Sequence, residues 1–230
     1  MFPFVTIIPA RGGSKGIARK NLQLINGKTL IERAIKSAQR IPNNHVYVSS
    51  DSDEILHLSK KSGAIPLKRS ETNSRDESSS ESVILESISK IEVSFEIITL
   101  LQATSPFIDL KGWSQALTVM NSNLEIGSMF SAVEKNEFTW QLNKDFWEPV
   151  NHKKTVRKPR QSLAKNVVET GSFYIFRKNL FLDEQSRFCG LVEPQITQNW
   201  SNFDIDTIED LELCQKIGNI IDEWSINQYL

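Results

Sequence analysis

The chain has 230 residues, of which 39% are hydrophobic and 24% charged, and its formal net charge is −1. This size and composition are typical of one globular α/β domain with a substantial core. The near-zero charge excludes a global basic field for nucleic acid, so any anion site must be local. Two distant cysteines and the absence of an apolar run of about 18 residues predict no disulfide framework, no signal peptide and no membrane span; we expect a cytoplasmic protein.

The N-terminus predicts a strand that opens into an anion-binding loop. Residues Phe4–Ala10 are apolar and β-branched, and they continue directly into the glycine-rich segment Arg11–Gly16. Glycines allow backbone N–H groups to approach an anion closely, and Arg11, Lys15 and Lys20 add positive charge. The loop matches neither GxxxxGK[ST] nor GxGxxG, but its composition suits a triphosphate. A tight turn with solvent-exposed lysines is the alternative.

Alternating helices and strands follow this loop. Apolar residues recur at helical spacing between Leu30 and Ala38, and His45–Ser49 reads as a strand. A helix over Glu54–Lys61 and a short edge strand over Gly63–Leu67 come next. This order predicts parallel strands with right-handed crossovers and a ligand site at the carboxyl ends of the strands.

Asp51-Ser52-Asp53 stands at one of these carboxyl ends. The triplet has two interpretations, a metal-binding DxD motif and an N-cap for the following helix. We favour the cap, because the helical pattern starts immediately afterwards.

The middle of the chain predicts a polar loop and the central strand. Residues Ser70–Ser82 are so rich in serine and charge that composition alone predicts a disordered loop, followed by a helix through Val83 to Ile91. Phe95–Leu101 is a near-continuous apolar run, as expected of a central strand. Thr104 or Ser105 would then cap a helix with Pro106 in its first turn, and a helix over Trp113–Met120 and a strand over Ser128–Val133 complete this region.

Residues 136–160 differ in character from the rest. They combine Trp140, Phe146 and Trp147 with prolines and a cationic cluster around His152–Arg160. Interleaved aromatic and polar residues predict a β-hairpin excursion, and projecting aromatic side chains favour a protein interface. For the cationic cluster a solvated surface is the commoner outcome.

Near the C-terminus, Asp204 and Asp206 alternate in an extended segment, which places their side chains on one face about 7 Å apart. Paired carboxylates suit Mg²⁺ or Mn²⁺, whose coordination phosphate and water oxygens would complete. Capping by Asp206 or Thr207, with Glu209 and Asp210 in the first helical turn, is the alternative. A final helix covers Leu211–Ile221, and the tail Trp224–Leu230 packs or frays.

Four segments spread over nearly the whole chain carry a family resemblance. They are Ala10–Ile17 with Lys20-Asn21, then Gln102–Pro106, Pro159–Phe176 and Phe203–Leu211. In this order they resemble the signatures of the CMP-sialic acid synthetases, the cytidylyltransferases that activate acidic nine-carbon sugars. The resemblance implies a single Rossmann-like nucleotidyltransferase domain over residues 1–230. Its sheet would be mixed, mostly parallel and flanked by helices, with a hairpin excursion that mediates dimerisation.

The resemblance also assigns roles. It implies that CTP and an acidic 2-keto sugar are the substrates, that the protein is a homodimer, and that neither nucleic acid nor membrane is a partner. The implied nucleotide-binding residues are Ala10, Arg11, Gly12, Gly13, Ser14, Lys15, Lys20, Asn21, Arg69, Asp76 and Ser80. The implied sugar-binding residues are Gln102, Arg160, Gln161 and Glu169, the metal ligands are Asp204 and Asp206, and the catalytic residues are Lys15, Arg11 and Asp206.

Several positions depart from the family pattern. Ala103 replaces a usual proline, Phe107-Ile108 lacks a usual arginine, and Val168 and Thr170 replace a usual arginine and asparagine. Valine cannot bind a carboxylate as arginine does, so the sugar acid must be held differently, by Arg160 or a lysine. The alternatives are a nucleotidyltransferase for another sugar or base, such as a 3-deoxy-octulosonate-like sugar or GTP, and a non-catalytic nucleotide-binding protein.

Overall fold

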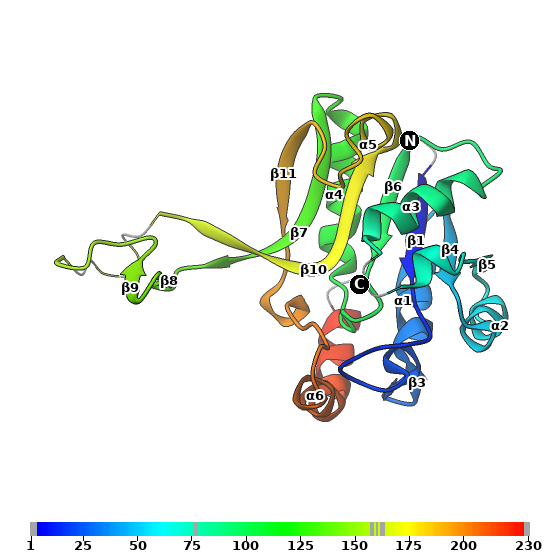
Figure 1. Ribbon diagram of the computed structural model, residues 1–230, viewed down its shortest axis with the longest axis horizontal. Helices are drawn as coiled ribbons and strands as arrows, with labels where there is room; N and C mark the ends of the chain where they lie inside the picture. Colours follow the sequence, from blue (N-terminus) through cyan, green and yellow to red (C-terminus); the bar gives the residue numbers. More distant parts are fainter. Residues whose placement is uncertain (1–3, 76–77, 157–158, 160, 162–163, 228–230) are drawn as a thin grey trace.

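A seven-stranded sheet forms the body of the molecule (Figure 1). The computed structural model describes residues 4–75, 78–156, 159, 161 and 164–227. The strand order is β11-β7-β10-β6-β1-β4-β5. The strands are β1 (Phe4–Pro9), β4 (Asn44–Ser50), β5 (Ile65–Lys68), β6 (Ile97–Leu101), β7 (Ile126–Lys135), β10 (Asn166–Arg177) and β11 (Leu191–Ile196).

Strand β10 is the one antiparallel member of this described sheet. It pairs antiparallel with both β6 and β7, whereas β1, β4, β5 and β6 pair in parallel, as do β7 and β11. The parallel strands therefore bring their carboxyl ends to one edge, where ligands of open α/β sheets bind. The predicted mixed, mostly parallel α/β sheet with β6 at its centre is confirmed.

Helices cover both faces of the sheet. The α-helices are α1 (Leu30–Gln39), α2 (Asp53–Lys61), α3 (Ser80–Ser89), α4 (Leu110–Ser122), α5 (Lys178–Glu184) and α6 (Ile208–Asn227). One face of β1 buries Ile8 in a cluster with residues of α1, α2 and α4, and the other buries Ile7 with residues of α3 and α5. The alternation of side chains along the strand thus divides the core into two layers.

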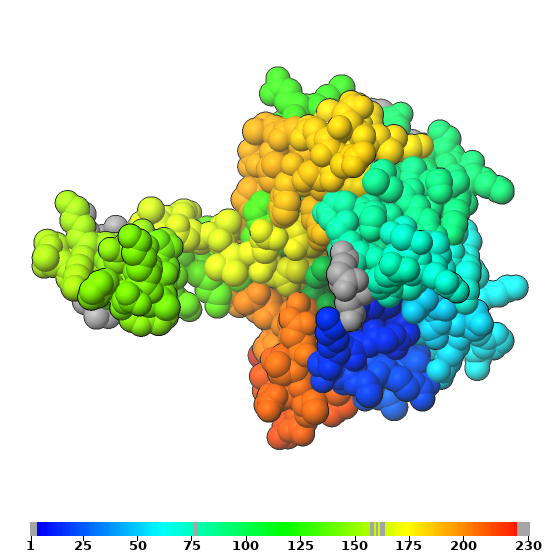
Figure 2. Space-filling model, viewed as in Figure 1, coloured from blue at the N-terminus to red at the C-terminus, as the bar shows by residue number. Residues whose placement is uncertain are grey.

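A third apolar cluster joins α6 to the N-terminal region. It contains Ile17, Ile25, Phe107, Ile205 and residues of α6. The short strands β2 (Leu24–Ile25) and β3 (Lys28–Thr29) form a small antiparallel ribbon here, and 3₁₀ turns cover Lys20–Leu22, Thr72–Ser74 and Asn199–Ser201. Helix α6 is therefore packed beside the segment that follows β1, and Figure 2 shows the orange and blue segments in contact.

An arm projects from this body (Figures 1 and 2). The ends of β7 and β10 leave the sheet as a two-stranded ribbon that carries the hairpin of β8 (Trp140–Asn143) and β9 (Phe146–Pro149). The predicted hairpin excursion is confirmed. Its aromatic residues are exposed, with Phe146 at 73% and Trp147 at 62% of their surface accessible.

Several expectations about individual elements were wrong. Asp109, not Thr104 or Ser105, caps α4, because its carboxylate accepts a hydrogen bond from the N–H of Gly112 at 3.0 Å. Helix α6 continues through Trp224 to Asn227, past the predicted end at Ile221. The polar stretch Ser70–Ser82 holds a 3₁₀ turn and the first turn of α3 rather than an entirely irregular loop.

Helix α5 and strand β11 had no counterpart in the expectations. No helix of the described residues has the length and apolar character that crossing a membrane requires.

Candidate nucleotide cleft

A cleft of about 310 Å³ opens at the carboxyl ends of β1 and β6. Parts of the chain that lie far apart in sequence meet here, namely the N-terminal loop, the Ser70–Ser80 region and the segment after β6. The lining residues are Pro9, Arg11, Ser14, Lys20, Asn21, Arg69, Asn73, Arg75, Ser78, Ser79, Ser80, Val83, Gln102, Ala103 and Thr104. Four of these described lining residues are arginine or lysine and none of them is acidic, so this part of the cleft favours an anion.

The glycine-rich loop is fixed by neighbouring backbone and side chains. The N–H of Ala10 donates to the carbonyl of Ser49 at 2.9 Å, which extends the pairing of β1 with β4 into the loop. The amide of Asn21, a buried residue, donates to the carbonyl of Arg11 at 2.9 Å. At the far end of the loop, a Cβ on Gly16 would lie 2.6 Å from the carbonyl oxygen of Asp206, so a side chain is excluded there.

Asp51 is a loop-positioning residue that sequence reasoning missed. Ser52 caps α2, with its hydroxyl accepting from the N–H of Ile55 at 3.4 Å, so the cap interpretation is confirmed. Asp51 does not cap the helix; its carboxylate instead accepts a hydrogen bond from the N–H of Gly12 in the glycine-rich loop at 2.8 Å. Only the position of Asp51 after a parallel strand pointed to such a role.

Arg69 is a buried cation within the cleft. Its guanidinium donates to the carbonyl of Ser49 at 2.7 Å and to the hydroxyl of Ser49 at 3.2 Å. Burial lowers the pKa of Arg69, and the charge of Arg11 adds to this effect, while the charges of Asp51 and Glu86 oppose it. A guanidinium stays protonated at neutral pH nevertheless, so a fixed positive charge faces the cleft.

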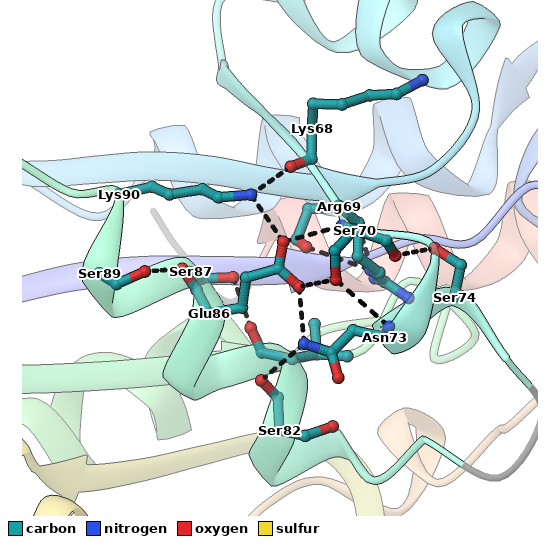
Figure 3. Close-up of polar contacts among 12 residues, drawn as sticks. Lys68, Arg69, Ser70, Asn73, Ser74, Ser82, Glu86, Ser87, Ser89 and Lys90 are labelled. Carbon is teal, nitrogen blue, oxygen red and sulfur yellow. Dashed lines mark hydrogen bonds and ion pairs between the residues drawn. The ribbon is translucent and has the colours of Figure 1, made fainter.

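The segment after Arg69 is held against α3 by Glu86 (Figure 3). The Glu86 carboxylate accepts from the N–H and hydroxyl of Ser70 at 2.8 and 2.9 Å, from Asn73 at 2.6 Å and from Lys90 at 2.6 Å. Burial alone would raise the pKa of Glu86, but these hydrogen bonds outweigh it and lower the pKa to about 2. The sequence-predicted Ser80 begins α3 and lines the cleft, while Asp76 lies outside the described residues.

Asn73, Arg75, Ser78 and Ser79 also line the cleft and were not singled out from the sequence. Their polar, serine-rich context hid them, because composition predicted disorder there. The spacing of Ser79 before Val83 and Ile84 was the available signal, since Ser79 caps α3 and accepts from the N–H of Ser82 at 3.1 Å.

Gln102, Gly171 and Asp204 meet at the opposite wall. The N–H of Gln102 donates to the carbonyl of Ser172 at 3.1 Å. Gly171 has a φ of +73°, and a Cβ there would lie 2.9 Å from Oε1 of Gln102 and 3.9 Å from Oδ2 of Asp204. A glycine is required because the backbone turns in the left-handed region and because Gln102 approaches so closely.

Lys20 links the two predicted metal ligands to the loop. Its ammonium donates to Oδ1 of Asp206 at 3.0 Å and to the carbonyl of Ile205 at 2.8 Å. Burial raises the pKa of Asp204, and the charge of Asp206 raises it further, against a hydrogen bond from Thr104 and the charge of Lys20. The two carboxylates therefore repel each other across a short extended segment.

This donor set fits a hard divalent cation, which would relieve the repulsion between the carboxylates. Among the described residues no group of three or more His, Cys, Asp or Glu side chains could hold a metal ion. Oxygens of phosphate and water would therefore complete the coordination. The metal site stays a prediction, whereas the capping alternative is confirmed at Thr207 and Asp210. The hydroxyl of Thr207 accepts from the N–H of Asp210 at 3.2 Å, and the carboxylate of Asp210 accepts from the N–H of Thr207 at 2.8 Å.

Comparison with known proteins identifies the family. The family model described as cytidylyltransferase matches residues 5–223. The chain belongs to the cytidylyltransferase family. It is 36% identical over 179 residues to N-acylneuraminate cytidylyltransferase A of Danio rerio, a match that covers 76% of this chain and 41% of that protein. It is 31% identical over 220 residues to pseudaminic acid cytidylyltransferase of Campylobacter jejuni, covering 91% of this chain and 93% of that protein.

A solved structure supports the same fold. The structure of CMP:2-keto-3-deoxy-manno-octonic acid synthetase in complex with CTP superimposes with a TM-score of 0.72 at 17% identity, covering 94% of this chain and 98% of that one. The chain spans only about two fifths of the length of the Danio rerio relative (41%). The fold and family are thus shared, and the substrates belong to the proposal below.

In this cytidylyltransferase, the residues expected to bind sugar lie farther apart than those that line the nucleotide cleft. Glu169 is exposed and accepts a hydrogen bond from the hydroxyl of Tyr174 at 3.0 Å. Gln161 is exposed and precedes Asn166, where the pairing of β10 with β7 begins, and Arg160 lies outside the described residues. Four of the expected nucleotide contacts in or next to the glycine-rich loop do not line the cleft, namely Ala10, Gly12, Gly13 and Lys15. Of these, Lys15 is exposed.

The two family departures on β10 have different structural consequences. Thr170 is buried, and its hydroxyl contacts the hydroxyl of Ser131 at 2.7 Å and that of Ser172 at 3.2 Å. Thr170 therefore supports the strand rather than a ligand. Val168 is about half exposed (48%) at the start of the arm, where an apolar side chain offers no hydrogen bond to a carboxylate.

Proposed function

We propose that this protein transfers CMP from CTP to an acidic 2-keto nonulosonate sugar and releases pyrophosphate. The observation that carries the proposal is a cleft lined by four cations and bordered by the carboxylate pair Asp204 and Asp206, in a chain of the cytidylyltransferase family. Relatives named for N-acylneuraminate and pseudaminic acid support the class of sugar. Both are acidic nine-carbon 2-keto sugars.

The reaction needs positioning and charge neutralisation more than covalent catalysis. The sugar's anomeric hydroxyl attacks the α-phosphorus in line, a P–O bond forms, and the bond to the pyrophosphate oxygen breaks. Arg11 and Lys20 line the cleft beside Arg69 and would neutralise the phosphates together with Lys15. The N–H of Gly12 donates to Asp51 and that of Ala10 to the carbonyl of Ser49, so Gly13 and Ser14 are the loop residues whose amides would bind the triphosphate.

Asp204 and Asp206 would hold Mg²⁺ or Mn²⁺, which supplies charge neutralisation at the phosphate oxygens when it is bound. Lys20 contacts Asp206 in the ligand-free protein, and we expect its ammonium to shift to a phosphate when both substrates are present. Tyr174 is not a base for the sugar hydroxyl at neutral pH. Burial and the hydrogen bond to Glu169 raise the pKa of Tyr174 to about 12.

Gln102 contributes its side-chain amide where the cleft meets Gly171, and it is the best-placed of the expected sugar contacts. Gln161, Glu169 and Arg160 are the other expected sugar contacts. The exposed hairpin aromatics support a homodimer in which the arm contacts a second copy of the chain.

A substrate panel tests this function. Purified protein is mixed with Mg²⁺, one of four nucleoside triphosphates and one of several sugar acids, and pyrophosphate release is measured. We expect turnover only with CTP and a nonulosonate, with the eight-carbon 3-deoxy-octulosonate much poorer. Turnover with GTP but not CTP would refute the proposal, as would a preference for the eight-carbon sugar.

Single substitutions test the roles proposed for Arg11 and Asp206. Arg11→Ala and Asp206→Asn should each lower kcat/KM at least tenfold, about 1.4 kcal/mol or more of transition-state stabilisation. Glu212→Gln, which alters an exposed carboxylate of α6, is the matched control and should leave kcat/KM within twofold. Equal activities of all three variants would refute the assigned roles.

A further inference from the structure

A second cleft of about 340 Å³ lies between α1, α6 and the segment before α4. It shares no lining residue with the nucleotide cleft. Its lining residues are Lys28, Arg33, Lys36, Ser37, Arg40, Pro106, Phe107, Ile108, Leu110, Trp200, Ile221 and Asp222. We call it the basic cleft, because four of these residues are cationic and one is acidic.

The cations of the basic cleft are gathered by local structure. Arg33, Lys36 and Arg40 recur at intervals of three and four residues, which places them on one face of α1 and its C-cap. Lys28 joins them from β3, and its ammonium lies so close to that of Lys36 that Lys36 lowers the pKa of Lys28. Like charges held this close are costly unless an anion joins them.

The single acid of the basic cleft is paired with Arg33, one of its four cations, although its charge also acts on Lys28. The Asp222 carboxylate binds the guanidinium of Arg33 at 2.5 and 3.0 Å and accepts from Asn26 at 2.8 Å. Arg33 is fixed further by donation to the carbonyl of Pro106 at 3.2 Å. Outside the cleft, the negative charge of Glu32 also acts on Lys36, but its carboxylate accepts from the N–H of Thr29 at 2.9 Å. An excess of positive charge therefore remains at Lys28 and Lys36.

Apolar groups form the rest of the wall. Phe107, Ile108 and Leu110 are buried, and the guanidinium carbon of Arg33 lies 5.4 Å from the centre of the Phe107 ring. Trp200 contributes an indole whose buried N–H has no hydrogen-bond partner in the described structure. Phe107 and Trp200 therefore give the cleft an apolar wall beside its cations.

We propose that the basic cleft binds an organic anion. A phosphate or carboxylate group would lie between Lys28 and Lys36, and a ring or short apolar body would pack against Phe107 and Trp200. Charge and an apolar wall in one cavity of this size are the usual composition of a small-molecule site. The site is separate from catalysis and does not depend on the proposed reaction.

The basic cleft is nevertheless connected to the nucleotide cleft. Pro106 and Phe107 continue the chain from Gln102, Ala103 and Thr104, which line the nucleotide cleft. Phe107 packs edge-on against Phe203 with ring centres 5.8 Å apart, directly before Asp204. A ligand in contact with Phe107 would therefore be separated from Asp204 by the ring of Phe203, which precedes Asp204 in the chain.

Titration calorimetry with phenyl phosphate tests the proposal, because this probe combines a phosphate with a ring. We expect saturable one-site binding to the full chain, with inorganic phosphate and phenol each at least tenfold weaker, since each supplies only half of the contacts. Lys28→Gln and Lys36→Gln should each weaken phenyl phosphate binding at least fivefold. The exposed Lys216→Gln on α6 is the matched control and should change the affinity less than twofold.

A second variant separates the two clefts. Arg11→Ala removes a cation from the nucleotide cleft and should leave phenyl phosphate binding within twofold. Binding that is lost in Arg11→Ala but retained in Lys28→Gln and Lys36→Gln would place the probe in the nucleotide cleft and overturn the proposal. Absence of saturable binding would overturn it as well. Neither result bears on CMP transfer, which the substrate panel measures independently.

Discussion

Single carboxylates fix both loops that border the nucleotide cleft. Asp51 accepts the N–H of Gly12, and Glu86 gathers donors from Ser70, Asn73 and Lys90. Neither residue lines the cleft itself. Glu86 acts through Asn73, which lines the cleft, and Asp51 acts through Gly12, which adjoins the lining residue Arg11, so both are positioning residues rather than catalytic ones. Their hydrogen bonds order the loops before a nucleotide arrives, which reduces the entropy lost on binding.

Glu86→Gln should weaken both stability and nucleotide binding. The amide keeps its size but loses the charge-assisted hydrogen bonds, so we expect about 1–3 kcal/mol of destabilisation at pH 7 and a higher KM for CTP with a smaller change in kcat. The pKa of Glu86 is lowered from 4.5 to about 2, so its contribution is complete above pH 4.5 and is lost as the pH falls towards 2. The measurement is urea unfolding at several pH values.

The stability difference between wild type and Glu86→Gln should therefore shrink as the pH falls through this window. Glu212→Gln, at an exposed site on α6, should show no such dependence. A difference that stays constant from pH 7 to pH 2.5 would contradict the role assigned to the Glu86 charge.

At the scale of elements, sequence periodicity predicted those helices and strands whose own residues show a clear apolar pattern. The apolar spacing of α1 and the continuous apolar run of β6 match the elements found at Leu30–Gln39 and Ile97–Leu101. Helix α5 is too short, at seven residues, to show a clear periodicity. Strand β11 is an edge strand with Pro194 in its middle, and proline counts against a strand in any sequence argument.

The residues of the nucleotide cleft could be predicted in part, namely where they follow a strand that the sequence pattern shows. The glycine-rich loop, Gln102 and the Asp204 region follow recognisable strands, so their convergence follows from topology. The contributions of Asn73 and Arg75 depend on a tertiary contact between their loop and Glu86, and no local pattern encodes that contact.

The first turn of α6 should couple helix stability to the carboxylate pair. Thr207 and Asp210 cap the helix reciprocally, and Asp210 also accepts from the N–H of Asp206 at 3.1 Å. Thr207→Ala should cost about 1 kcal/mol in urea unfolding and should also lower kcat/KM, because Asp206 loses a fixed neighbour. Thr118→Ala, at an exposed position within α4, is the control for helix propensity. Full activity in a destabilised Thr207→Ala protein would show that the cap does not position Asp206.

At the scale of the whole molecule, the arm places apolar residues far from the core. Phe146 and Trp147 belong to none of the apolar clusters of the body, yet they are among the most exposed aromatic residues described. Their exposure stabilises nothing within one chain. We propose that a partner covers the hairpin and that this partner is a second copy of the chain.

The combined variant Phe146→Ser/Trp147→Ser should therefore convert a dimer into a monomer. Because both side chains are exposed, the unfolding free energy of the body should change by less than about 0.5 kcal/mol. Light scattering after size exclusion measures the mass. Leu124→Ser, at an exposed apolar residue of the body (66% accessible), should leave the dimer intact. A monomeric wild-type protein would refute the dimer.

The irregularity in the β7–β10 pairing makes the arm an exchangeable module. Regular pairing holds from Asn166 to Glu169, breaks, and resumes at Tyr174 within the body. Gly171, which lies close to Gln102, is inside this break. We therefore expect a shift of strand register in the arm to leave the position of Gly171 unchanged. Chimaeras joined at Lys135 and Asn166 would thus exchange the arm of one family member for another while the cleft keeps its geometry. Because Arg160 and Gln161 lie in the exchanged segment, such a chimaera would carry the proposed dimer contact and these two expected sugar contacts together.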